Sequence, residues 1–132
     1  MKLKNIVFAS LTLASLPILV IAKDNDLGLS KQFETCMDKS GGNTSGMVEC
    51  LSAEAKKQDV RLNKAYKEVL AQLAPARAIQ LKEAQRAWLK FHDANCAYYY
   101  DPDGGTMARV SANDCVMSST ATRAKELENF KQ

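Results

Sequence analysis

The chain has few side chains of the kinds that carry out catalysis. His92 is the single histidine, and the 15 acidic residues are scattered along the sequence. Glycoside hydrolysis needs two carboxylates that flank one cleft, and nucleophilic catalysis needs a base positioned beside a serine or a thiol. The sequence marks neither arrangement, and it has no glycine-rich phosphate loop following a strand. We therefore expect no catalytic residue, no cofactor and no enzymatic activity.

The residues with the most definite chemistry are four cysteines, Cys36, Cys50, Cys96 and Cys115. An even count favours disulfides in an exported protein, although four cysteines permit three pairings. We favour Cys36–Cys50 and Cys96–Cys115 because each pair encloses a glycine-rich loop, and closing a loop of about 15 to 20 residues stabilises a fold by roughly 3 kcal/mol. No two cysteines have C-x-x-C spacing, so we expect neither a metal site nor a redox-active thiol pair.

Residues 1–22 have the pattern of a secretory signal peptide. Lys2 and Lys4 precede an uncharged stretch, and Val20 and Ala22 suit the small-residue positions before a cleavage site. The apolar stretch has about 16 residues, fewer than the roughly 20 of a membrane-spanning helix. We expect cleavage after Ala22, a mature helical domain over residues 23–132 with no membrane span, and a periplasmic or secreted location.

Composition fits one globular domain, with 46% hydrophobic and 25% charged residues. The net charge of the whole chain is +3. Lys2 and Lys4 leave with the signal peptide, so 18 basic residues become 16 against 15 acidic ones, a net charge of +1. Proteins that bind nucleic acid through the backbone phosphates are usually far more basic. We therefore expect that the protein does not bind nucleic acid.

Helical periodicity predicts the elements that must position these side chains. Three helices are expected over residues 45–73, 76–99 and 106–130, with Thr44 or Ser45 capping the first. The inward positions recur three or four residues apart, with one interval of seven in the third helix: Leu51, Ala55, Gln58, Leu62, Tyr66, Val69 and Leu73, then Leu81, Ala84, Trp88, Phe91 and Asn95, then Met107, Val110, Met117, Ala121, Ala124 and Leu127.

No segment alternates with a period of two residues, so a sheet is not expected. Residues 23–31 are polar and are predicted to fray, and residues 33–38 are predicted to form only a short turn or helix. The predicted fold class is therefore all-α, a small three-helix domain with two disulfides.

Polar and aromatic side chains recur at helical spacing on the first two predicted helices. Stripes of this kind, when they face each other, form hydrogen-bonded networks that set the helix register. We therefore expect a structural network rather than a ligand groove from Asp59, Asn63, Tyr66, Gln85, Arg86, Trp88, His92 and Asp93.

The segment that follows the second predicted helix is the best candidate for recognition. Three consecutive tyrosines at a helix end cannot all point inward, and tyrosine provides a large contact area at low entropic cost. The neighbouring acids complement a basic partner. The expected partner-binding residues are Tyr98, Tyr99, Tyr100, Asp101 and Asp103. In the alternative, the tyrosines of a helix-ending turn pack on the first helix.

Two strings resemble a known family of exported proteins, the LprI-like lysozyme inhibitors. They are Asp59-x-x-Leu62-Asn63-x-x-Tyr66 and Ala84-Gln85-Arg86-Ala87-Trp88, the second followed by Asp93-x-x-Cys96. The resemblance covers residues 36–128, and one departure is His92, where members of the family usually carry arginine. The founding member of the family inhibits lysozyme, and most relatives are uncharacterised.

The resemblance implies an exported envelope protein that binds and inhibits lysozyme or a related peptidoglycan hydrolase by steric occlusion. The alternative is a non-catalytic periplasmic interaction protein, or an immunity-like protein, with a different partner. Either protein would act by binding alone.

Overall fold

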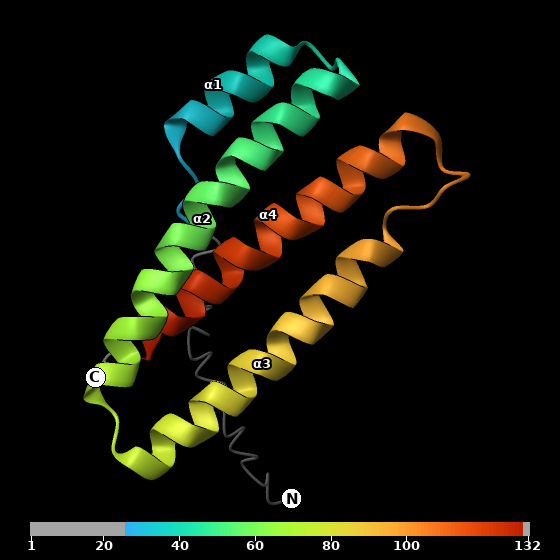
Figure 1. Cartoon of the computed structure of the whole chain (residues 1–132). Helices are drawn as coiled ribbons and strands as arrows, with labels where there is room; N and C mark the ends of the chain where they lie inside the picture. The colour runs from blue at the N-terminus through green and yellow to red at the C-terminus, as the bar shows by residue number, and fades with distance from the viewer. Residues whose placement is uncertain (1–25, 131–132) are drawn as a thin grey trace, which may run out of the picture.

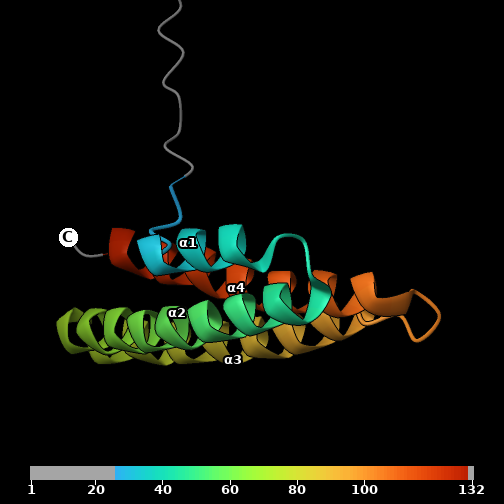
Figure 2. The same cartoon turned by 90° about the horizontal axis from the view of Figure 1, so that it is seen from above.

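The computed structural model describes residues 26–130, so the predicted signal peptide over residues 1–22 lies outside the described residues. Four helices follow one another, α1 (Lys31–Ser40), α2 (Thr44–Gln72), α3 (Pro75–Tyr98) and α4 (Gly105–Asn129). They run side by side in alternating directions, with α4 between α2 and α3 (Figure 1). From above, α1 and α4 form one layer and α2 and α3 the other (Figure 2).

The all-α prediction is confirmed, and the three predicted long helices match α2, α3 and α4 to within one residue at each end. The prediction of three helices is wrong because α1 is a helix of 10 residues. Ser30 caps its start by accepting a hydrogen bond from the Phe33 amide, and Gly41 ends it in the left-handed conformation. Its apolar residues Phe33, Cys36 and Met37 lie at helical spacing but are only half-buried. A periodic pattern of so few residues is a weak signal for a helix.

Residues 26–30, the described part of the segment before α1 that was predicted to fray, are instead bound to α2. The backbone amide and the hydroxyl of Ser30 donate to the two carboxylate oxygens of Glu54, at 2.9 and 2.6 Å. Gln58 donates to the same carboxylate at 2.8 Å and to the Gly28 carbonyl at 3.1 Å. Glu54 is only 1% exposed. Burial raises the pKa of Glu54, but the hydrogen bonds from Ser30 and Gln58 and the charge of Lys57 outweigh it and lower the pKa.

The core lies mainly where α2 packs along α4. Ala65 on α2 and Ala121 and Ala124 on α4 are buried at this contact, and such small side chains let the two helices approach closely. The α3 helix packs against the contact through one buried leucine, Leu81. The main cluster consists of Leu62, Ala65, Val69, Leu81, Ala124 and Leu127.

The predicted inward face of α3 is wrong at Ala84 and at Phe91, which is 64% exposed, and the predicted inward Met107 of α4 is exposed as well. On α3 the buried residues are Leu81, Gln85 and Cys96. At about 100° per residue, Gln85 lies within roughly 40° of Leu81 around the helix, whereas Phe91 lies about 80° away. Because one of these buried residues is polar and another is a cysteine of a disulfide, the pattern of apolar residues alone does not predict which face of α3 is buried.

Both favoured disulfides are confirmed. Cys36–Cys50 joins α1 to α2 and Cys96–Cys115 joins α3 to α4, with Cα–Cα distances of 5.7 and 5.4 Å. The predicted cap of α2 is wrong by one residue, since the Asn43 side chain accepts the hydrogen bond from the Gly46 amide. Within residues 26–130, none of the helices combines the length and apolar character needed to cross a membrane.

Candidate functional site

The loop between α3 and α4 forms one tip of the bundle and projects beyond the neighbouring helices (Figure 1). Tyr98, Tyr99 and Tyr100 are 84%, 47% and 50% exposed. The rings of Tyr98 and Tyr99 meet edge to face, with centroids 6.1 Å apart. These exposures exclude the alternative in which the three tyrosines pack on α2.

The tip has its own hydrogen bonds. The Tyr100 amide donates to the Ala97 carbonyl at 3.0 Å, and the Asp103 amide donates to the Asp101 carboxylate at 2.9 Å. The Gly104 amide donates to the Asp101 carbonyl at 3.1 Å. A Cβ at Gly104 would lie 3.0 Å from that of Ala108 and 3.1 Å from that of Asp101, so a side chain there would push these neighbours apart by a few tenths of an ångström. The loop is therefore a folded turn with a defined shape.

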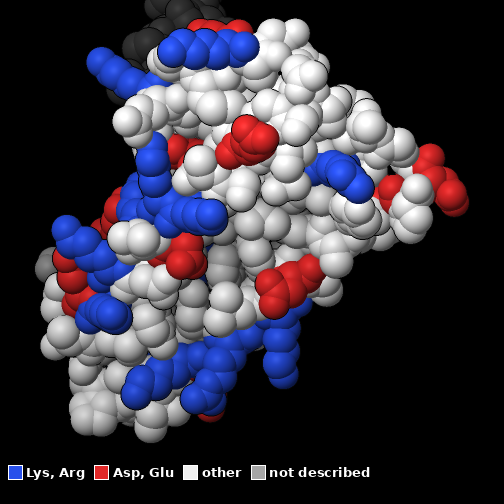
Figure 3. Space-filling model, turned by 45° about the horizontal axis from the view of Figure 1, so that its top comes forward, with Lys and Arg blue, Asp and Glu red and all other residues white. Residues whose placement is uncertain are grey.

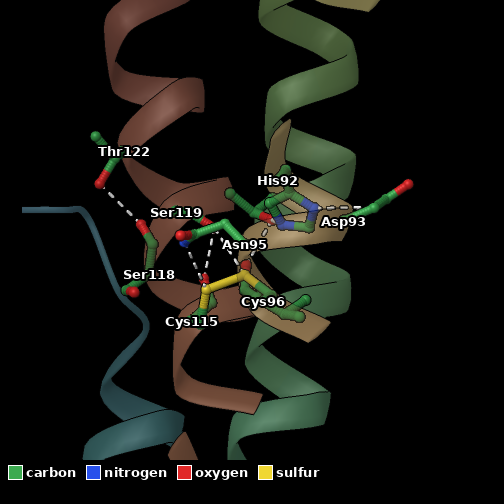
Figure 4. Close-up of a disulfide and its surroundings, with 10 residues drawn as sticks. His92, Asp93, Asn95, Cys96, Cys115, Ser118, Ser119 and Thr122 are labelled. Carbon is green, nitrogen blue, oxygen red and sulfur yellow. Dashed lines mark hydrogen bonds and ion pairs between the residues drawn. A yellow bond between two sulfur atoms is a disulfide. The ribbon is translucent and has the colours of Figure 1, made fainter. Parts of the chain in front are cut away.

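A disulfide holds the base of the tip. Cys96 lies near the end of α3, and its partner Cys115 lies in α4 (Figure 4). Asn95 donates to the Cys115 sulfur at 3.5 Å. Fixing the two helices behind the loop reduces the entropy that the tip would lose on binding.

The tip combines aromatic rings with exposed carboxylates. Asp101 and Asp103 are exposed, and Figure 3 shows acidic side chains gathered at this end of the molecule, on the right. Two shallow hollows of about 390 Å³ share Tyr100, Asp101 and Pro102, and Arg109 borders one of them. This surface suits aromatic contacts and hydrogen bonds from lysine or arginine side chains of a partner.

The residues of the expected network are placed differently. A groove of about 460 Å³ between α2 and α3 brings together Asp59, Asn63, Tyr66, Gln85, Arg86 and Trp88. The amide of Asn63 donates back to Asp59, at 2.9 Å to its carbonyl and 3.0 Å to its carboxylate. Since Asp59, Asn63, Arg86 and Asp93 are exposed, these four cannot belong to a buried network.

A buried polar contact does exist on the other side of α3, and its main member was not predicted. Arg123 of α4 is buried and donates to the Gln85 side chain at 2.9 Å and to Glu126 at 2.6 Å. Its guanidinium lies 6.0 Å from the Trp88 ring centre. In the sequence, Arg123 lies between Ala121 and Leu127 on the apolar face of α4. A charged residue at such a position indicates a buried polar partner, and this was the signal that could have predicted the contact.

His92 completes this seam between α3 and α4. Its ring lies 4.9 Å from that of Trp88, its Nδ1 is 3.2 Å from the Asp93 carboxylate and its Nε2 is 3.4 Å from the Thr120 hydroxyl. Gln85, Trp88 and His92 thus share one helix face, as their spacing predicted. Residues 26–130 contain no group of three or more histidine, cysteine or acidic side chains placed to hold a metal ion.

Comparison with known proteins identifies one family. The profile of that family, described as lysozyme inhibitor LprI, matches residues 36–127. An uncharacterized protein from Rhizobium meliloti is 29% identical over 97 residues, which cover 63% of this chain and 70% of the relative. No solved structure is significantly similar. The matched region contains both disulfides and the whole tip between α3 and α4.

Proposed function

This chain belongs to the LprI family of lysozyme inhibitors, and from that premise we propose that it is an exported protein that binds and inhibits lysozyme or a related peptidoglycan hydrolase. The observation that carries the proposal is the family match over residues 36–127. Two disulfides support export, because they form and persist in oxidising compartments such as the periplasm.

The proposed mechanism is steric occlusion by the tip between α3 and α4. Lysozyme cleaves its substrate with two carboxylates in a cleft, so an inhibitor needs only to fill or cover that cleft. Tyr98, Tyr99 and Tyr100 supply exposed aromatic anchors of the kind that dominate binding energy. Asp101 and Asp103 supply carboxylates for a basic partner. The inhibitor performs no chemistry in this mechanism.

A turbidity assay with the mature, oxidised protein tests the proposal. Lysis of bacterial cells by lysozyme should slow in a saturable way as the protein is added. Unchanged lysis at a large molar excess would refute inhibition of lysozyme and would favour the periplasmic interaction or immunity-like alternative.

Variants of the tip test the mechanism separately. Tyr100→Ala and Asp101→Asn should each weaken inhibition by about tenfold or more, as expected for anchors at the centre of an interface. Val60→Ala is a matched control, because Val60 is exposed on α2 and is remote from the tip in the chain. If the control weakened inhibition as much as the tip variants, the tip would not be the inhibitory surface.

A further inference from the structure

A second concave surface lies between α3 and α4, behind the tip. It is a groove of about 570 Å³, within the range of roughly 300–1,000 Å³ that small-molecule sites occupy. Trp88 borders both this groove and the one between α2 and α3. The rest of its lining is distinct, and its two walls differ in chemistry.

The α3 wall is aromatic. Trp88, Phe91 and Tyr99 line it, and Phe91 is 64% exposed although it is the most apolar of the three. An exposed phenylalanine beside a half-buried tryptophan is an apolar surface without a partner in the described chain. Aromatic faces carry negative charge density, so they attract the weakly positive C–H groups that cover the face of a pyranose ring.

The α4 wall is made of small polar side chains. It presents the hydroxyl groups of Ser111, Ser118, Ser119 and Thr122 and the carboxylate of Asp114. The hydroxyls of Ser119 and Thr122 already donate to backbone carbonyls of α4, so toward a ligand they act as acceptors, and a carboxylate accepts two or more hydrogen bonds. Asn95 adds an amide from the α3 side. A ligand with many hydroxyl groups finds partners along this whole wall.

The charge of the lining narrows the ligand class. Asp114 is its single charged residue, with no lysine or arginine among the lining side chains. This disfavours nucleotides, phosphates and acidic glycans, because their charge would meet a carboxylate. A peptide helix that docks in a groove needs an apolar wall on both sides, and here the α4 wall is polar.

The walls are held at a fixed separation. The disulfide between Cys96 and Cys115 joins α3 to α4, and Asn95, Ser118 and Thr122 lie around it (Figure 4). A covalently fixed groove is pre-organised, so ligand binding costs little ordering of the protein. We propose that the groove between α3 and α4 binds a neutral oligosaccharide, with Phe91 and Trp88 stacking on its sugar rings and the Asp114 carboxylate accepting hydrogen bonds from its hydroxyl groups.

Tryptophan fluorescence provides the test, because Trp88 is the single tryptophan of the chain. The mature, oxidised protein is titrated with the tetramer of N-acetylglucosamine and, separately, with the tetramer of glucose. The expected result is a saturable change in Trp88 emission at millimolar or lower concentration with at least one tetramer. The two titrations distinguish acetamido sugars from simple glucans. No lysozyme is present, so the outcome is independent of the proposed inhibition.

Because Trp88 borders two grooves, variants are needed to test which of them holds the ligand. Phe91→Ala and Asp114→Ala, both at exposed positions, should each weaken binding about tenfold. Leu89→Ala is the matched control, since Leu89 is an exposed apolar residue of α3 that lines the opposite groove. Circular dichroism confirms that each variant is folded. The proposal is overturned if neither tetramer changes the emission, or if Leu89→Ala alone weakens binding.

Discussion

Glu54 holds the segment before α1 in place, and removing its carboxylate should destabilise the domain by about 3 kcal/mol. Glu54→Ala deletes three hydrogen bonds, two from Ser30 and one from Gln58. A hydrogen bond to a charged group contributes roughly 1.5–3 kcal/mol, but Ser30 regains water once the segment detaches, so we count about 1 kcal/mol for each. For a domain of this size, a loss of about 3 kcal/mol lowers Tm by at least about 12 °C.

Chemical denaturation followed by circular dichroism measures this loss. Glu54→Gln keeps the shape and loses the charge, so the expected cost is about half that of Glu54→Ala. Lys57→Ala measures what the neighbouring cation adds. Its ammonium lies 3.7 Å from the Glu54 carboxylate and donates to Ser30 Oγ at 3.0 Å and to Gln32 at 2.6 Å. Because Lys57 is exposed, these contacts together should contribute only about 1 kcal/mol or less. A Glu54→Ala protein within 1 kcal/mol of the wild type, a threshold set by the roughly 1 kcal/mol we assign to one of these bonds, would refute the reasoning.

The pH dependence provides a second test of Glu54. Its pKa in the folded protein lies below the ordinary value of 4.5, so its ionised form stabilises the fold. This stabilisation is fully present above pH 4.5 and is lost as the pH falls through the lower folded pKa. The difference in stability between the wild type and Glu54→Gln should therefore be complete at neutral pH and shrink in acid. A difference that stays constant down to about pH 3, well into this transition, would contradict the assignment.

Three further measurements test other parts of the structure. Reduction of both disulfides should lower Tm clearly, since each closes a loop of 14 or 19 residues and contributes about 3 kcal/mol; an unchanged melting curve in dithiothreitol would contradict a structural role. Trp88→Ala should cost about 2 kcal/mol in urea denaturation, less than the roughly 3–5 kcal/mol of a fully buried tryptophan, because Trp88 is half-buried. Gly28→Ala should destabilise by about 1 kcal/mol or more, because Gly28 has φ +67° and an added Cβ would lie 2.8 Å from Arg61; thermal denaturation of a variant as stable as the wild type would contradict this.

The sequence alone was sufficient for the long helices. Most of their apolar positions repeat every three or four residues. Pro75 marks the boundary between the first two long helices, and Pro102, Gly104 and Gly105 mark the boundary between the last two. The sequence also favoured the two disulfides that the structure contains, because each cysteine pair lies close in the chain on either side of a turn, although the choice among three pairings came only with the structure. These features depend on neighbours within about 20 residues, so local patterns determine them. The exposed tyrosines followed from the same logic, since three adjacent rings cannot share one face of a helix.

Tertiary structure decided the features that join distant parts of the chain. Ser30 and Glu54 are 24 residues apart and Gln85 and Arg123 are 38 apart, and no periodicity links either pair. Glu54 and Arg123 are buried because a polar partner reaches each of them from another segment of the chain. The side of α3 that faces inward depends on such a partner as well. Because Arg123 of α4 binds Gln85, the face with Gln85 is buried and Phe91 stays exposed. Spacing along the chain can place a residue on a helix face, but which face becomes buried is settled by the helices that pack against it.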